Sequence, residues 1–174
     1  MNRLISKLFF LLLFVVCACS LKKNVSIENY NLINCPSDGK CSIEVINNKS
    51  LVVSFNEDNT ISYTLNDDFN HSVIRFHFKK NMDQIEHDGA YSELLVFEIS
   101  NIDGSNALKD EALQTTNMLF GRFCFCRGQV GLYKIKEGTL EWTKKGKDLQ
   151  FNLNFQCNDV PQVVKNIKVI NGKL

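Results

Sequence analysis

The chain of 174 residues lacks the sequence motifs by which most enzymes are recognised. It has no glycine-rich phosphate loop, no Gly-x-Ser-x-Gly nucleophile elbow and no His-Glu-x-x-His zinc motif. Of its three histidines, His71 and His77 would lie about 20 Å apart on a strand, and His87 follows in a polar stretch. The sequence therefore predicts no catalytic residue, no metal and no cofactor, and it favours a protein that is not an enzyme.

An excess of charge of one sign is also missing. Lysine and arginine number 20 against 19 aspartates and glutamates, so the net charge is only +1. A chain so balanced has no general attraction for nucleic acid, and we expect no nucleic-acid partner. Proline occurs twice and tryptophan once, whereas phenylalanine occurs 13 times. These phenylalanines are expected to fill a core, although they could instead line a cavity for an apolar ligand.

The longest uncharged apolar run covers residues 8–19 and is too short to span a membrane, which requires roughly 20 apolar residues. Arg3 and Lys7 precede this run, and small residues end it. A basic start, a short apolar stretch and small residues before a cleavage site are typical of a secretory signal peptide. We therefore expect residues 1–18 to be a signal peptide that is removed on export.

The end of the apolar run, Val-Cys-Ala-Cys at residues 16–19, resembles the lipobox of bacterial lipoproteins. The resemblance implies that the Cys19 thiol receives a diacylglycerol and that Cys19 becomes the first residue of the mature chain, with residues 19–24 as a lipidated tether. Ser20 is similar to the sorting pattern for the outer membrane, which implies a lipid-anchored protein on the bacterial outer membrane, facing the periplasm. The alternative is an ordinary signal-peptidase cut, which would give a soluble secreted protein.

Seven cysteines in a chain of this size are typical of an oxidising compartment. A Pro-Ser-Asp-Gly turn separates Cys35 from Cys41, so these two are predicted to form a disulfide that stabilises by roughly 2 kcal/mol. Cys124 and Cys126 would share one face of a strand about 7 Å apart, so we expect one of them to pair with Cys157. The sequence does not decide which of them pairs. If Cys19 is not lipidated, its thiol is available to pair as well.

Apolar and polar residues alternate with a period of two along most of residues 25–174. A three-residue turn at 57–59 would pair Phe55 with Ile61 and Val53 with Tyr63, which keeps apolar residues opposite each other. Nearer the C-terminus the alternation predicts a three-stranded meander at residues 133–136, 139–143 and 149–157.

Two turns set the register that we expect in this meander. A turn at Glu137 and Gly138 would pair Ile135 with Leu140, and a turn at residues 144–147 would pair Trp142 with Leu149. Only residues 105–118 have helical spacing.

These patterns predict a single, mainly β domain over residues 25–174. The fold is expected to be an antiparallel β-sandwich or β-barrel of about eight to ten strands with one short helix. The function that we favour is a lipid-anchored module of the cell envelope that binds or assembles with a protein or a polysaccharide. Two alternatives are a calycin-like carrier of a lipid or other apolar ligand, and an envelope enzyme whose site carries no recognisable motif.

Overall fold

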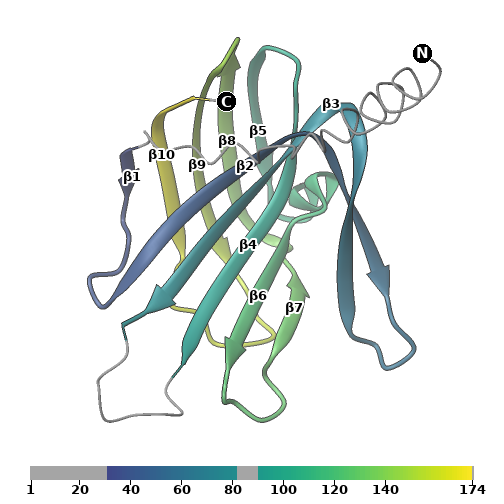
Figure 1. Ribbon diagram of the computed structural model, residues 1–174, viewed down its shortest axis with the longest axis vertical. Coiled ribbons are helices and arrows are strands. Elements are labelled where there is room, and N and C mark those ends of the chain that lie inside the picture. Colours follow the sequence, from purple (N-terminus) through teal and green to yellow (C-terminus); the bar gives the residue numbers. More distant parts are fainter. Residues whose placement is uncertain (1–30, 82–89, 174) are drawn as a thin grey trace, which may run out of the picture.

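Two antiparallel sheets pack face to face in the computed structural model, which describes residues 31–81 and 90–173 (Figure 1). Each sheet has five strands, in the orders β2-β3-β4-β6-β7 (the β4 sheet) and β1-β10-β9-β8-β5 (the β9 sheet). The predicted β-sandwich is therefore confirmed. The strands are β1 (Asn31–Ile33), β2 (Gly39–Phe55), β3 (Ile61–Lys80), β4 (Tyr91–Ser100), β5 (Gly104–Lys109), β6 (Leu119–Cys124), β7 (Gly131–Lys134), β8 (Glu137–Lys145), β9 (Asp148–Gln156) and β10 (Asn166–Lys173).

Some predictions concern residues that the structure does not describe. These are the signal peptide (residues 1–18), the lipidation of Cys19, the tether (residues 19–24) and the placement of His87. Among the described residues, no helix is long and apolar enough to cross a membrane.

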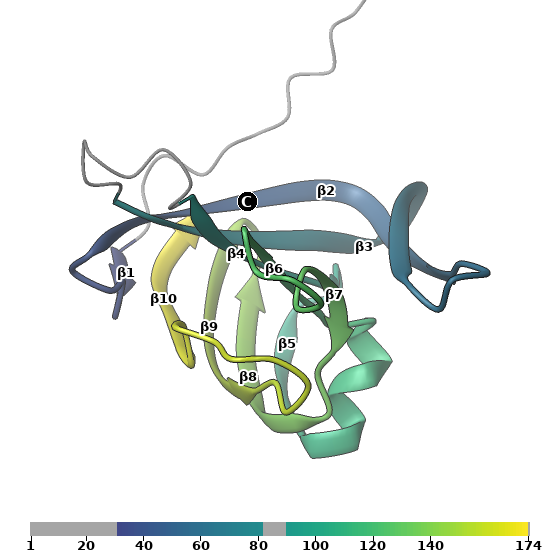
Figure 2. The ribbon, with the colours of Figure 1, turned by 90° about the horizontal axis from the view of Figure 1, so that it is seen from below.

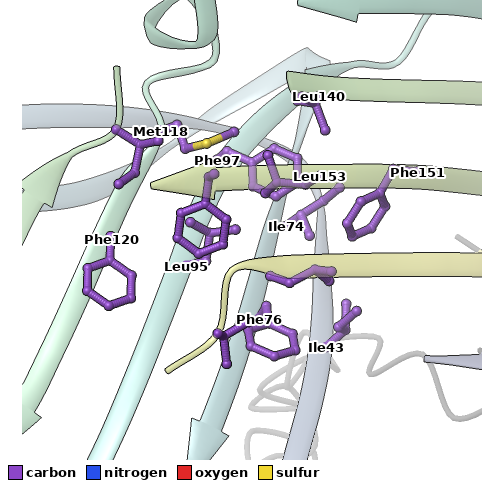
Figure 3. Packing of buried hydrophobic residues seen from close by; sticks show 14 of the residues in the cluster. Ile43, Ile74, Phe76, Leu95, Phe97, Met118, Phe120, Leu140, Phe151 and Leu153 are labelled. Atoms are coloured by element: carbon purple, nitrogen blue, oxygen red, sulfur yellow. The ribbon is translucent and has the colours of Figure 1, made fainter. Parts of the chain in front are cut away.

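Aromatic and aliphatic side chains from the inner faces of both sheets form the main core (Figure 3). The Phe97 and Phe151 rings meet edge to face with their centroids 5.6 Å apart, and the Phe120 and Phe155 rings lie 5.9 Å apart. Each pair joins one strand of the β4 sheet to β9, so the rings hold the two sheets together. These phenylalanines therefore serve as core residues.

The far ends of β2 and β3 form a hairpin, residues 49–67, which we call the arm. The arm lies beside β7 (Figure 1) and curls away from the plane of the β4 sheet (Figure 2). A second apolar cluster lies between its inner side and the outer face of the β4 sheet. The residues of this cluster are Ile46, Leu51, Val53, Ile61, Tyr63, Leu65, Val73, Leu94, Val96, Leu119 and Leu132.

Polar side chains stabilise the bend at which the arm leaves the sheet. The buried carboxylate of Glu98 accepts hydrogen bonds from the Leu51 backbone N–H (2.6 Å) and from the Asn117 amide (2.9 Å). On the β3 side, the Asn101 amide donates to the carbonyls of Phe69 and His71, both at 2.9 Å. The arm is thus tied to β4 at Leu51, and β3 is held to the end of β4 just beyond the arm.

The predicted pairings are partly confirmed. The hairpin turning at residues 57–59 has the expected register, with Phe55 opposite Ile61 and Val53 opposite Tyr63. The expected pairing of Ile135 with Leu140 is wrong, because β7 pairs with β6 and the chain then crosses to β8 in the other sheet.

The register of the β8–β9 hairpin also differs from the prediction. Trp142 lies opposite Phe151 instead of Leu149, because the strands run on to Lys145 and Asp148 and leave a tighter turn between them. Gly146 takes a positive φ of 58° in this turn, and its N–H donates to the Asp103 carboxylate at 2.9 Å. The shift of two residues keeps the same side chains on the inner face.

The helix predicted over residues 105–118 is only half correct. Its first residues form β5, which pairs with the edge of β8. A short 3₁₀ helix, Asp110–Thr116, follows and places Leu113 in the core. The positive φ of 51° at Asp110 breaks the strand, and the Asp110 carboxylate accepts a hydrogen bond from the Gly138 N–H at 3.1 Å.

Candidate functional site

The structure confirms the first predicted disulfide. Cys35 and Cys41 are bonded across the Pro-Ser-Asp-Gly turn with their Cα atoms 5.8 Å apart. This bond closes the connection between β1 in the β9 sheet and β2 in the β4 sheet. It therefore fastens the connection that follows β1 to the start of β2.

The pairing predicted for Cys157 is wrong. Cys124 and Cys126 are bonded to each other, and Cys157 is a free, buried thiol. The prediction assumed that a straight strand would hold Cys124 and Cys126 too far apart. Instead β6 ends at Cys124 and the chain bends at Phe125, which brings the two Cα atoms to 5.2 Å, within the range of a disulfide.

The free thiol of Cys157 lies in the main core, where it has little access to solvent. Burial raises the pKa of this thiol, and the nearby carboxylates of Asp159 and Glu93 raise it further. At neutral pH the sulfur is therefore protonated and a poor nucleophile. We assign Cys157 a structural role in the core.

The Cys124–Cys126 bond makes a closed three-residue tip that presents Phe125 to solvent. The Phe125 side chain is 87% exposed, and Phe123 on the outer face of β6 is 40% exposed. Both rings border a hollow of about 400 Å³ at this end of the β4 sheet. The lining residues of this hollow are Lys79, Ala90, Tyr91, Ser92, Phe123, Cys124 and Phe125.

A second hollow of about 330 Å³ adjoins the first, because both are lined by Lys79 and Ser92. We call the two together the tip groove. It runs from Phe125 across β4 and β3 to Lys40 on β2. The second hollow is lined by Lys40, Cys41, Ser42, His77, Phe78, Lys79 and Ser92.

The charge along the tip groove is of one sign. Lys40 and Lys79 line the groove, and no acidic residue is among the described residues that line it. Burial lowers the pKa of His77 and the charge of Arg75 lowers it further, so His77 is neutral at pH 7. The groove thus combines two aromatic rings at one end with two lysine ammonium groups.

A buried carboxylate supports the base of the tip. Glu93 on β4 is only 1% exposed and points between the sheets. It accepts hydrogen bonds from the Tyr91 hydroxyl (2.5 Å) and from the backbone N–H groups of Val163 (2.5 Å) and Val164 (2.8 Å). Glu93 therefore fastens the β9–β10 connection to β4.

Arg122 extends this support to the turn that follows the tip. It lies opposite Glu93 in the β4–β6 register, and its guanidinium carbon is 5.4 Å from the centre of the Tyr91 ring. Its Nη1 donates to the side chain of Gln129 at 2.6 Å. Burial raises the pKa of Tyr91 to about 12, and the hydrogen bond to Glu93 adds to this effect, so the phenol remains a donor at neutral pH. The tip is thus held on rigid strands.

The sequence singled out Cys124 and Cys126 but missed the residues around them. Glu93 and Arg122 occur in strand patterns where polar residues usually face solvent, so their burial left no periodic signal. The exposure of Phe123 and Phe125 was not predicted either, because an aromatic residue in a strand pattern usually lies in the core. Among the described residues, no three His, Cys, Asp or Glu side chains lie close enough to hold a metal ion.

Comparisons of the chain with protein-family models, with curated proteins and with solved structures gave no match.

Proposed function

We propose that the chain is a non-enzymatic, lipid-anchored module of the bacterial envelope that binds a protein partner through the tip groove. The observation that carries the proposal is the exposure of Phe125 on a tip closed by a disulfide. Aromatic side chains in well-packed pockets dominate the energetics of many protein interfaces. The disulfide restrains the backbone of the tip before binding, so this segment loses less conformational freedom when a partner covers it.

The groove also indicates the chemistry of the partner. Phe123 and Phe125 offer contact area to an apolar side chain, while Lys79 and Lys40 attract carboxylates. The partner is therefore a protein segment in which an apolar residue lies beside acidic residues. The carrier alternative has less support, because the core phenylalanines contact one another across the sandwich.

Photo-cross-linking in whole envelopes tests the partner. A photoreactive phenylalanine analogue at position 125 is expected to give a discrete adduct with one envelope protein. The same analogue at position 69 is the control, since Phe69 is 81% exposed but lies near the opposite end of the β4 sheet. Equal adducts from both positions, or adducts with lipid alone, would contradict a protein partner at the tip groove.

A charge reversal tests the groove itself. Lys79→Glu is expected to lower the yield of the adduct at position 125 about tenfold, because it places a carboxylate against an acidic partner. Lys147→Glu in the β8–β9 turn makes the same change in net charge away from the groove and should leave the yield unchanged. A similar loss in both variants would show that only overall charge matters.

The intact mass of the protein from the membrane fraction tests the anchor at Cys19. We expect a chain that begins at Cys19 and carries two or three acyl chains. Alkylation without reductant should add no group to the folded protein and one group to the denatured protein, at Cys157. A Cys157→Ser variant should take up none, and an unacylated chain would rule out the lipid anchor.

A further inference from the structure

The outer face of the β9 sheet, away from the tip groove, carries a separate hollow of about 460 Å³. It crosses β5, β8, β9 and β10 and has a size typical of small-ligand sites. Three of its lining residues, Trp142, Phe151 and Val169, are core residues and turn their side chains inward. The side chains that line the hollow therefore belong to the residues that alternate with these three along the strands and point to the outer face of the sheet.

The strand register arranges these outer side chains in rows across the sheet. One row runs Ala107, Glu141, Asn152 and Lys168, because each lies opposite the next on the neighbouring strand. Neighbouring strands are about 4.8 Å apart, so the row is about 14 Å long. A second row contains Ser105, Thr143 and Gln150, two residues further along the strands.

The long row presents complementary hydrogen-bonding groups. The Glu141 carboxylate only accepts, the Asn152 amide both donates and accepts, and the Lys168 ammonium only donates. Within the described residues, the side chains of Glu141 and Lys168 have no hydrogen-bonding partner or ion pair. The amide of Asn152 is oriented by the neighbouring strand, since its oxygen accepts a hydrogen bond from the Asn166 amide of β10 at 3.2 Å.

We infer that this face binds a neutral polysaccharide, with its hydroxyl groups laid along the row from Glu141 to Lys168. A carboxylate accepts from adjacent hydroxyls, and an ammonium group donates to hydroxyl or ring oxygens. One negative and one positive charge cancel across the row, so the face has no preference for an anionic polymer. A protein partner would require apolar anchors, and Ala107 and Ile170 are the only apolar outer side chains here.

Affinity electrophoresis tests this inference with the full chain in mild detergent. Native gels are cast with one soluble polysaccharide each: dextran, galactomannan, mixed-linkage glucan and, as the anionic comparison, alginate. We expect at least one neutral polymer to retard the protein and alginate to have no effect. Glu141→Ala and Asn152→Ala should each weaken the retardation at least tenfold in apparent Kd, as expected when a hydrogen bond to a charged or fixed group is lost.

Thr139→Ala is the matched control, because Thr139 is on the same strand and face as Glu141 but outside the hollow. It should leave retardation unchanged, as should Phe125→Ser at the other site. Retardation by none of the neutral polymers, or retardation that survives Glu141→Ala and Asn152→Ala, would overturn the inference. So would retardation by alginate that is lost at high salt. If the protein binds no polysaccharide, the proposed protein partner is unaffected, because that partner binds at the β4 sheet.

Discussion

Replacing Glu93 with alanine is expected to lower the free energy of unfolding by about 3–5 kcal/mol. The Glu93 carboxylate accepts hydrogen bonds from Val163 N–H, Val164 N–H and the Tyr91 hydroxyl in a nearly solvent-free position. Without it the two backbone donors have no acceptor, and each unsatisfied buried donor costs about 1–3 kcal/mol. The β9–β10 connection would also lose its attachment to β4.

Urea unfolding followed by the fluorescence of Trp142 measures this loss, since Trp142 is the only tryptophan and is buried. Glu141→Ala is the control, because this exposed glutamate should change stability by less than about 0.5 kcal/mol. Glu93→Gln keeps one acceptor oxygen and should fall between the two. A loss below about 1 kcal/mol for Glu93→Ala would show that the connection is held mainly by its apolar contacts.

The fold class could be predicted because burial repeats with a period of two along most strands. In β9, Leu149, Phe151, Leu153 and Phe155 are all buried, and the residues between them face outward. A register slip of one residue would expose that entire set, so the alternation in such a strand determines which side chains face the core. The hairpin at Phe55 and Ile61 could be predicted for the same reason.

Pairing between sheets could not be predicted in the same way. The pattern around Glu137 and Gly138 fits a hairpin within one sheet as well as a crossing between two sheets. The arm was missed although β4 contains a signal for it, since Leu94, Leu95 and Val96 are buried in succession on both faces. Such a run indicates that both faces of a strand are covered.

The geometry of the tip groove could be predicted from the local sequence even less than the pairing between sheets. The bend at Phe125 decides that Cys124 bonds Cys126, and no residue of the Cys-Phe-Cys stretch requires a bend. The burial of Glu93 depends on backbone donors that lie 70 residues further along the chain. Contacts of that kind are set by the packing of the two sheets and cannot be read from a strand pattern.

Replacing Gly138 with alanine is expected to be about as damaging as removing Glu93. Gly138 lies near the start of β8, where the chain has just crossed from the β4 sheet, and it has a φ of 141°. A Cβ atom there would lie 2.1 Å from the Asn154 carbonyl oxygen and 2.8 Å from the Phe155 Cα. Backbone strain of roughly 1–3 kcal/mol adds to roughly 1–3 kcal/mol for the displacement of β9.

Gly131→Ala separates these two contributions, because Gly131 has nearly the same φ, 143°, but a Cβ atom there would meet nothing within 4 Å. That variant should lose only the backbone contribution of roughly 1–3 kcal/mol in the same urea measurement. The additional loss in Gly138→Ala then measures how closely β8 and β9 approach at the crossing. If the two variants were equally stable, the close approach at Gly138 would be relieved without cost, and only the positive φ would favour a glycine at the crossing.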